Sequence, residues 1–331
     1  MAAMGQRFAV LECVQKIEDI PIKYQILKQC SPSVMDWYVQ KYNPFTVSPI
    51  QLAGEEGLRV TLPMTEDELR LYPDKREAVT AATLQALRDY RVDILLPPKA
   101  YPMPFPGDIP VATGQTAFAF FLMPAIQRAL RTQSKDVKNA EILIIGAPDG
   151  LTALVLDRIY PHVNYLSLLV PQPEDVFAFA QKSEDIFAEC GLNLHVTTKN
   201  KAMLECADVV INLSESDTRH AYYYQRGAIY FDLSKNRRAL MELIGRRDDL
   251  IAIDSLQLTY RAFTYVLAEL ELILFVKSMD CRDLMLYPYN PAAARRLSRF
   301  IRTEGVEIRS FRCLDKTLNH TYFRGALGGT L

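Results

Sequence analysis

Short apolar runs alternate with helical stretches over the second half of the chain. Alternation of buried strands with helices of 7 to 18 residues is typical of a parallel, doubly wound sheet with right-handed crossovers. The pattern therefore predicts a Rossmann-type domain at residues 134–258. The runs expected to be strands are ILIIG (142–146), NYLSLLV (164–170), NLHVTT (193–198), DVVINLS (208–214), AIYFDLS (228–234) and LIAIDSL (250–256).

A second, smaller α/β lobe is predicted at residues 1–112. Its expected strands are RFAVLECV (7–14), GLRVTLPM (57–64) and RVDILLPP (91–98). A polar helical stretch precedes residue 42. Residues 65–90 are predicted to be helical, with acidic residues in the first turn and a division into two helices at Pro73.

The segment AYPMPFPGDIPVATG (100–114) is predicted to be a rigid loop at the lobe boundary, because proline fixes φ and cannot continue a ladder. A long apolar helix at about 115–132 follows, within a linker at 113–133. The architecture expected is thus two α/β lobes around a cleft.

Residues 259–331 are predicted to contain a long interlobe helix and a tail that returns to the first lobe. The apolar helix expected at 259–279 is interrupted by Glu269 and Glu271, which favours a buried helix over a membrane span. The tail carries a predicted helix, PAAARRLSRFIRTEG, and a predicted strand, VEIRSFR.

Composition narrows the class of protein. The 331 residues are 49% hydrophobic and 23% charged, as expected for about two globular domains. A net charge of -1 argues against a general polyanion binder, so no nucleic acid is expected as a partner. The start of the chain lacks a signal-peptide pattern and no stretch predicts a membrane span, which indicates a cytoplasmic protein.

Cysteine and histidine spacing gives no sign of a metal centre. The six cysteines form no CxxC pair and are interpreted as reduced, mostly structural thiols, and the four histidines are scattered. No metal site is therefore expected.

The turn GAPDGLT is the strongest candidate for a cofactor site. A strand that ends in a glycine turn and opens into a helix can hold a phosphate on backbone N–H groups. Of the glycine fingerprint only the first position is present, with Gly150 as an offset second, and the Asp149 carboxylate would repel a pyrophosphate unless it turns away. The candidate cofactor-binding residues here are Gly146, Ala147, Pro148, Asp149, Gly150, Leu151 and Thr152.

Two further strand ends complete the predicted cofactor crevice. After the second strand, where an acidic residue normally binds ribose hydroxyls, the chain has Gln172, which can form hydrogen bonds but cannot distinguish NAD from NADP by charge. The nearest basic residues are Lys199 and Lys201. After the fourth strand come Leu213 and Ser214, then Glu215 and Ser216, a loop that suits the nicotinamide side or an ordinary turn.

Candidate substrate and partner residues lie outside this turn. Thr61, Gln115 and Thr116, with Thr113, are expected to place donors in the cleft, although Gln115 and Thr116 equally fit a helix cap. Arg295, Arg299 and Arg302 share one face of the tail helix, opposite Leu297, Phe300 and Ile301. That face is interpreted as either a solvated surface or a dock for an acidic partner or phosphate.

Together, these segments resemble the long-chain acyl-[acyl-carrier-protein] reductases, relatives of the shikimate dehydrogenase and glutamyl-tRNA reductase group. The resemblance is one of order and pattern and covers roughly residues 7–275. The segments that carry it are RFAVLECVQKIEDIPIKYQIL, GLRVTLPMTEDEL, IPVATGQTAFAFFLMPAIQRAL, NAEILIIGAPDG, ADVVINLSES and AIYFDLSKN.

The resemblance also implies a catalytic cysteine, in a Cys-X-Ala-Glu context on the long late helix, that takes the acyl group as a thioester. The matching stretch here is VLAE, so the position holds Val266, and Cys281 lies fifteen residues further on. A thioester by this route is therefore not expected. The family's glycine-rich segment after the third strand is replaced by LLPPKAYPM.

The function expected from these observations is that of an NAD(P)-linked oxidoreductase-like protein. Its substrate would be a carbonyl or related small molecule in the interlobe cleft, reduced by direct hydride transfer, and no catalytic residue is assigned. One alternative is a non-catalytic binding or scaffold protein descended from such a reductase. Another is an S-adenosylmethionine-dependent enzyme, against which the missing acid after the second strand counts.

Overall fold

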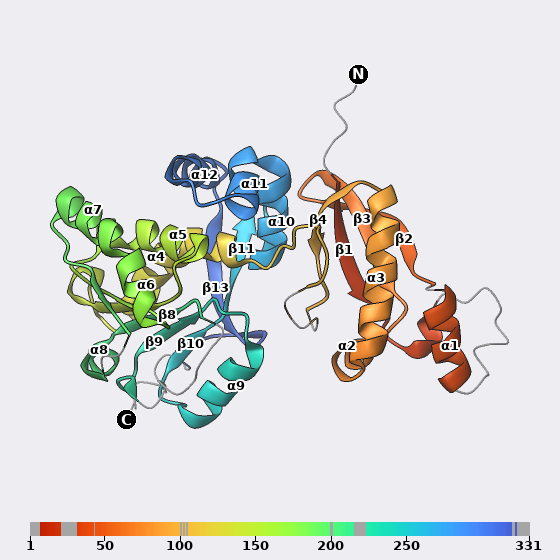
Figure 1. The fold of residues 1–331 in the computed structure, drawn as a ribbon, viewed down its shortest axis with the longest axis horizontal. Helices are drawn as coiled ribbons and strands as arrows, with labels where there is room; N and C mark the ends of the chain where they lie inside the picture. Colours follow the sequence, from red (N-terminus) through yellow and green to blue (C-terminus); the bar gives the residue numbers. More distant parts are fainter. Residues whose placement is uncertain are drawn as a thin grey trace, which may run out of the picture. The chain divides into compact units, whose positions relative to one another are not determined.

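The computed structural model describes residues 7–20, 32–42, 44–99, 101, 103, 105–198, 201–214, 223–319 and 322. The chain forms two compact units, each built from two stretches of sequence. Unit 1 consists of Met1–Thr113 and Ala268–Leu286, and unit 2 of Gly114–Leu267 and Tyr287–Leu331. Both units combine helices with a sheet (Figure 1), so the fold class is α/β as predicted.

Unit 1 contains a four-stranded mixed sheet with the order β2-β3-β1-β4. The strands are β1 (Arg7–Cys13), β2 (Thr46–Leu52), β3 (Glu55–Leu62) and β4 (Val92–Leu96). The central strand β1 runs parallel to β3 and β4, whereas β2 is antiparallel to β3. The three predicted strands are confirmed. β2 was not predicted, since this edge strand contains Pro49 and is mostly exposed, and so lacks an apolar run.

Two helices of unit 1 begin at residues that favour a helix start. Thr65 caps α2 with a reciprocal capping box to Glu68, and Pro73 is the first residue of α3, which confirms the predicted division. Leu69, Val79 and Leu87 bury the inner faces of these two helices in the core of the unit. The helical elements are η1 (Ile17–Asp19), α1 (Pro32–Tyr42), α2 (Glu66–Leu71), α3 (Pro73–Asp89), α10 (Leu267–Lys277) and α11 (Met279–Leu286).

Unit 2 is organised around a six-stranded, fully parallel sheet with the order β10-β9-β8-β5-β6-β7. This is the doubly wound order, in which β5 lies at the centre and the chain winds outward in both directions. All six predicted strands of this lobe are confirmed. They are β5 (Glu141–Ile145), β6 (Tyr165–Leu169), β7 (His195–Thr197), β8 (Val209–Asn212), β9 (Ile229–Asp232) and β10 (Ile251–Ile253).

Helices cover both faces of this sheet. Leu204 of α8 and Leu240 of α9 pack on the face that carries Tyr230. On the other face Phe118 of α4 meets Phe231 edge to face, with 6.2 Å between ring centroids. The helical elements are α4 (Gln115–Thr132), η3 (Val137–Asn139), α5 (Gly150–Ile159), η4 (Tyr160–His162), α6 (Pro173–Ala178), α7 (Ala180–Cys190), α8 (Lys201–Cys206) and α9 (Arg237–Arg246).

Residues 259–279 do not form the single helix that was predicted. The first part belongs to a β-hairpin of β11 (Ser255–Tyr260) and β12 (Phe263–Val266), and α10 begins only after it. Arg261 and Ala262 make the turn with positive φ angles. Leu256, Leu258 and Tyr260 of β11 are buried and alternate with partly buried residues, which is the alternation of a strand.

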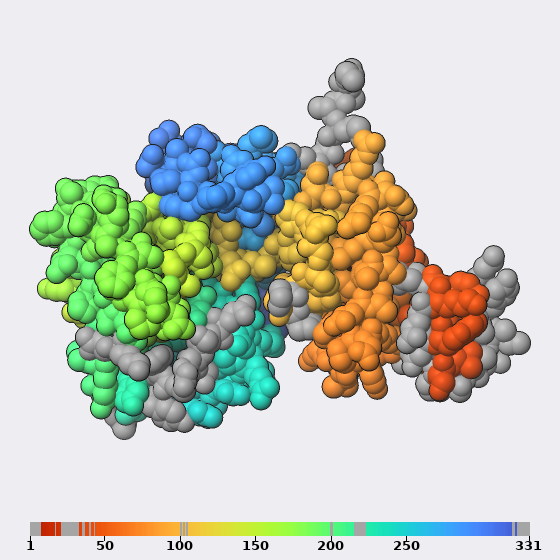
Figure 2. Space-filling view, viewed as in Figure 1, coloured from red at the N-terminus to blue at the C-terminus, as the bar shows by residue number. Residues whose placement is uncertain are grey.

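The tail also differs from the prediction that it returns to the first lobe. Residues Tyr287–Leu331 group with unit 2, because β13 (Glu307–Cys313) pairs antiparallel with β11 and then with β14 (Lys316–Thr317). The helix and strand predicted within this tail are confirmed as α12 (Pro291–Thr303) and β13. Figure 2 shows α12, in dark blue, on the surface of this unit.

Candidate functional site

The carboxyl ends of β5 and β8 meet at the centre of the unit 2 sheet. In the strand register Ile145 lies opposite Asn212. The Gly146 N–H donates to the Leu169 carbonyl at 3.1 Å, and the Leu213 N–H donates to the Ile145 carbonyl at 2.8 Å. From β5 the chain continues to β6 on one side, and its later part returns as β8 on the other. This is the switch point at which open α/β sheets bind ligands.

Gly146 is required at this turn by close packing. A Cβ on this residue would lie 2.6 Å from Thr152 Oγ1 and 3.2 Å from Leu213 Cδ1, both nearer than normal contacts. The glycine thus lets the first turn of α5 and the loop after β8 approach β5. In a dinucleotide-binding turn such close packing of the helix on the strand is the part that the third glycine plays. Here Gly146 permits it, and Leu213 is brought beside the turn.

Asp149 is the N-cap of α5. Its carboxylate Oδ1 accepts a hydrogen bond from the Thr152 N–H at 2.7 Å, and its carbonyl accepts from the Ala153 N–H. The carboxylate therefore does not turn away from the helix N-terminus, and it places a negative charge there. Among the described residues, the N–H groups of Gly150 and Leu151 have no acceptor, so two donors remain at the exposed start of the helix.

Two further groups shape this helix. Thr152 is fully buried, and its Oγ1 has no hydrogen-bond partner. Tyr289 packs over the start of the helix, with its Cβ 3.7 Å from where a Gly150 Cβ would lie, and its hydroxyl donates to Asp157 Oδ2 at 2.5 Å. Burial and the bond to Asp157 raise the pKa of the Tyr289 phenol. The sequence does not indicate Tyr289, because this residue is distant from the glycine turn along the chain and lies in a segment without a motif.

The turn residues Ala147 and Pro148 lie at the rim of this site. Ala147 is partly buried, its carbonyl accepts from the Asp149 N–H at 2.8 Å, and Pro148 is exposed. Leu151 is partly buried in the first turn of α5. These residues thus surround the helix start without adding a charged group.

Gln172 follows β6 and is the N-cap of α6. Its N–H donates to Asp175 Oδ2 at 3.2 Å and the residue is exposed. Of the two basic residues considered beside it, Lys201 pairs with Glu205 at 3.4 Å, and Lys199 lies outside the described residues. A charged group at this strand end is Asp175, whose carboxylate accepts from the Gln172 N–H in the capping box of α6.

The ends of β8 and β9 are joined by the Leu233 N–H, which donates to the Asn212 carbonyl at 2.8 Å, and the loop after β9 meets the start of α4. Asn212 Oδ1 accepts from the Ser214 N–H at 3.2 Å, and Gln115 Nε2 donates to the Leu233 carbonyl at 2.7 Å. Gln115, Leu213 and Ser214 therefore gather along the same sheet edge. Thr116 follows Gln115 in the first turn of α4. Glu215 and Ser216 lie outside the described residues.

Two carboxylates at this edge, one buried and one half-buried, were not predicted. Asp232 ends β9 and accepts hydrogen bonds from Asn212 Nδ2 at 3.2 Å and from Ser234 Oγ at 2.7 Å. Asp254 follows β10, with Oδ2 accepting from the Leu314 N–H at 3.0 Å and Oδ1 buried without a partner. Burial raises the pKa of both carboxyl groups. The available signal was an Asp directly after each of two apolar strands.

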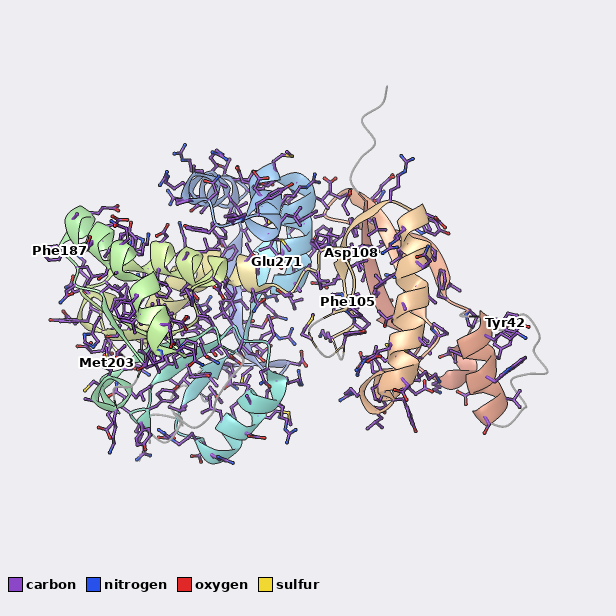
Figure 3. The ribbon with its side chains drawn as sticks, viewed as in Figure 1. Tyr42, Phe105, Asp108, Phe187, Met203 and Glu271 are labelled. Carbon is purple, nitrogen blue, oxygen red and sulfur yellow. The ribbon has the colours of Figure 1, made fainter. Side chains whose placement is uncertain are left out.

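The remaining substrate-side candidates belong to unit 1. Thr61 lies near the end of β3, opposite Glu12 of β1 and Thr46 of β2 in the strand register. The Thr113 N–H donates to Oε1 of Glu271, a buried residue of α10 that is labelled in Figure 3, at 2.9 Å. Thr61 and Gln115 thus lie in different units, and their common role in a site stays a prediction.

Cys13, Cys281 and Cys313 do not supply the nucleophile that the family resemblance implies. Val266 ends β12 rather than lying within a helix. Cys281 is buried in α11, and burial raises the pKa of its thiol. Burial likewise raises the pKa of Cys13 and of Cys313 to about 12. These three thiols are therefore protonated at neutral pH and unreactive.

Arg295, Arg299 and Arg302 lie on the exposed face of α12, while Leu297 and Ile301 are buried. Among the described residues none of the three arginines has an acidic partner. The acidic partner predicted for this face stays a prediction.

The described part of the chain contains no group of three or more His, Cys, Asp or Glu side chains placed to hold a metal ion. None of its helices combines the length and hydropathy needed to cross a bilayer.

Comparison with known proteins finds matches at the level of structure alone. No family model matches the chain, and no curated protein matches it. The chain is similar to the iminosuccinate reductase of Paracoccus denitrificans in complex with NAD+, at 16% identity and a TM-score of 0.27. That match covers 38% of this chain and 39% of the reductase, so less than half of the reductase is spanned.

Two longer matches have comparably low scores. One is L-tryptophan dehydrogenase from Nostoc punctiforme, at 13% identity and a TM-score of 0.31, covering 89% of this chain and 88% of that one. The other is shikimate 5-dehydrogenase from Listeria monocytogenes in complex with shikimate and NAD. It is 10% identical, with a TM-score of 0.34, and the match covers 89% of this chain and 96% of that one.

Proposed function

We propose that unit 2 binds a nicotinamide dinucleotide at the carboxyl ends of β5 and β8, and that the protein is an NAD(P)-linked oxidoreductase. The observation that carries the proposal is the glycine turn at the switch point of a parallel six-stranded sheet. Two N–H groups at the exposed start of α5 have no acceptor within the described part of the chain.

The shape of the turn fits a dinucleotide, and one charge opposes it. Gly150 and Leu151 would hold the pyrophosphate by their N–H groups, and Gly146 keeps the strand and helix close. The Asp149 carboxylate at the same helix N-terminus would repel the phosphates. The expected affinity is therefore weak, and removal of that single charge should increase it.

On this proposal the nicotinamide supplies or accepts a hydride, and the protein orients the substrate beside it. Leu213 and Ser214, with Gln115, would line the nicotinamide side, because they share the carboxyl edge with the turn. The substrate would be a carbonyl or a related small molecule. The protein would then be a relative of the shikimate dehydrogenase and acyl-reductase group that acts without a thioester, since Val266 holds the cysteine position.

The test is a titration of the full chain with NADH and NADPH, followed by nicotinamide fluorescence and thermal shift, for the wild type and for Asp149→Asn. Asparagine caps a helix as well as aspartate does, so this variant removes the charge and keeps the cap. The affinity should rise at least threefold. Asp136→Asn is the matched control, because Asp136 caps η3 before β5, at the opposite edge of the sheet.

The outcome also decides the second candidate function, a non-catalytic binding or scaffold protein. The self-capping Asp149 favours that alternative, because the helix start already carries an anion of its own. If neither nucleotide binds at millimolar concentration to the wild type or to Asp149→Asn, the oxidoreductase proposal is wrong.

A further inference from the structure

Unit 1 contains a groove of about 460 Å³ that is independent of the site in unit 2. It lies between the exposed face of α3 and the loop that follows β4, the loop on which Phe105 and Asp108 are labelled in Figure 3. Its volume falls within the range of roughly 300–1,000 Å³ typical of small-molecule pockets.

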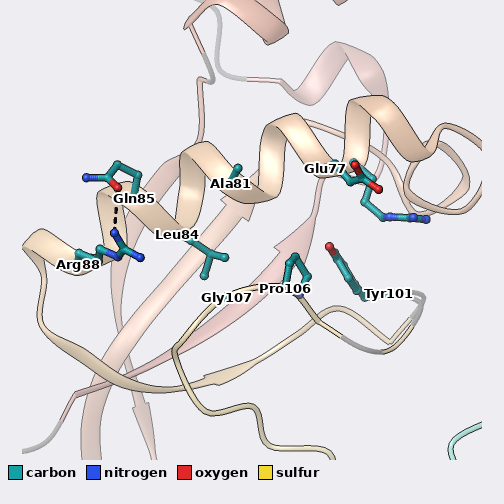
Figure 4. A pocket seen from close by; sticks show the side chains of 9 residues that line it. Glu77, Ala81, Leu84, Gln85, Arg88, Tyr101, Pro106 and Gly107 are labelled. Atoms are coloured by element: carbon teal, nitrogen blue, oxygen red, sulfur yellow. Dashed lines mark hydrogen bonds between the residues drawn. The ribbon is translucent and has the colours of Figure 1, made fainter.

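The groove is built by closely fitted apolar groups. Leu84 and Tyr101, both buried, form its floor. On the side formed by α3, the small side chain of Ala81 fills little of the groove. Gly107 adopts φ +110°, and a Cβ on it would lie 2.8 Å from Leu84 Cδ1, so only glycine lets the loop approach the helix here. Figure 4 shows Leu84 lying between α3 and Gly107.

One end of the groove carries two opposite charges that have no ion-pair partner among the described residues. The Arg76 guanidinium lies 5.8 Å from the centre of the Tyr101 ring and donates to the Leu69 carbonyl at 3.3 Å. Among the described residues Arg76 has no carboxylate within 4.0 Å, and Glu77 has no basic group within that distance. Arg76 is partly buried, and a partly buried cation of this kind favours a bound carboxylate.

The other end of the groove is already paired. Arg88 donates to Gln85 Oε1 at 3.3 Å, as Figure 4 shows, and to Asp108 Oδ2 at 3.3 Å. The two charges without an ion-pair partner therefore lie at the end next to Glu77. From a rise of 1.5 Å per residue, Ala81 lies about 6 Å and Leu84 about 10 Å further along the helix.

We propose that this groove binds a zwitterionic amino acid with a large apolar side chain. The ligand carboxylate pairs with Arg76 and the ligand ammonium with Glu77, while its side chain lies on Leu84 and Tyr101 beside Ala81. A simple carboxylate would satisfy Arg76 but would leave its charge facing Glu77. A simple amine would pair with Glu77 but would leave its charge facing Arg76.

The test is calorimetric titration of the full chain with L-phenylalanine and L-tryptophan, and with three analogues of phenylalanine. 3-Phenylpropionate lacks the ammonium, L-phenylalaninamide lacks the carboxylate and L-alanine lacks the ring. Each analogue should bind at least tenfold more weakly than L-phenylalanine. Equal binding of 3-phenylpropionate, or no binding of either amino acid at millimolar concentration, would overturn the proposal.

Variants locate the site. Ala81→Phe fills the groove and should weaken L-phenylalanine at least tenfold, whereas Ala82→Phe, at the next exposed position of α3 outside the groove, should not. Glu77→Gln changes an exposed residue without an ion pair, so folding should be retained. It should weaken L-phenylalanine while leaving 3-phenylpropionate unchanged or tighter, and unchanged affinity for L-phenylalanine would contradict the proposed role of Glu77.

Discussion

The close approach at Gly146 can be tested by adding one methyl group. In Gly146→Ala the new Cβ would lie 2.6 Å from Thr152 Oγ1, 3.3 Å from Thr152 Cγ2 and 3.2 Å from Leu213 Cδ1. The backbone at Gly146 does not adopt a positive φ, so alanine is not excluded by conformation and the cost is steric. Overpacking of this kind typically costs about 1–3 kcal/mol.

A second substitution shows whether Thr152 is the source of that cost. Thr152→Ala removes two of the three crowding atoms, and it also deletes a buried hydroxyl that has no partner. Loss of the methyl group and loss of the unsatisfied hydroxyl act in opposite directions, so this variant alone should change stability little. The double variant should recover at least about 1 kcal/mol of the Gly146→Ala loss, as a coupling between residues in contact.

The assay is urea unfolding of the full chain, read in unit 2 by hydrogen exchange of peptides from β5 and β8. Trp37, the only tryptophan, reports on unit 1, and its fluorescence midpoint should not move. Gly245→Ala is the control, because Gly245 lies in α9 with no atom within 4 Å of an added Cβ, and it should stabilise by about 0.5–1 kcal/mol. A loss below about 0.5 kcal/mol in Gly146→Ala, or no recovery in the double variant, would refute the reasoning.

Two further predictions concern buried charges. Lys75 Nζ lies 2.7 Å from Glu68 Oε1, and both side chains are largely buried. Lys75→Met should therefore lower the free energy of unfolding, measured by Trp37 fluorescence, by about 3 kcal/mol. Arg70→Met, in an exposed pair, should lower it by nearly nothing. A loss no larger than that of Arg70→Met would contradict this. Burial raises the folded-state pKa of Asp254, so its contribution to stability is full below pH 3.8 and falls as pH rises through that raised pKa. In Asp254→Asn the urea midpoint of unit 2 should therefore fall less steeply as pH rises. The exposed control Asp248→Asn should keep the slope of the wild type. If Asp254→Asn also has that slope, the idea is wrong.

The parallel sheet of unit 2 could be predicted because its strands are short apolar runs between clear helices. Ile142 and Ile144 on one face, and Leu143 on the other, are all buried, so the run has no polar position to obscure it. Gly191 adopts φ +73° at the end of α7, as a helix-stop signal implies.

The hairpin at 255–266 could not be predicted from the same kind of pattern. Its turn uses Arg261 and Ala262 instead of Asn-Gly or Asp-Gly, so the usual signal is missing. The apolar residues of the hairpin also run directly into Leu267 and α10, which made strand and helix appear continuous.

The candidate site was foreseen only where it is local in sequence. The turn from Gly146 to Thr152 is one segment, and its contacts follow from its spacing. Tyr289, Asp232 and Asp254 reach the same unit from distant segments, and only the strand order and the pairing of β13 with β11 place them. The role of Asp149 as a cap depended on a side-chain rotamer that a single sequence does not specify.

The divided sequence of unit 1 has a consequence for the order in which the protein is made. Domains commonly fold as units from the N-terminus while the ribosome adds about 5–20 residues per second. Here Glu271 accepts from the Thr113 N–H and Lys277 pairs with Glu55 at 2.6 Å, so α10 belongs to a unit whose sheet was translated first. Translation of Gly114–Leu267 takes roughly 8–30 s at that rate. Unit 1 therefore lacks α10 during the time in which the central sheet of unit 2 is translated.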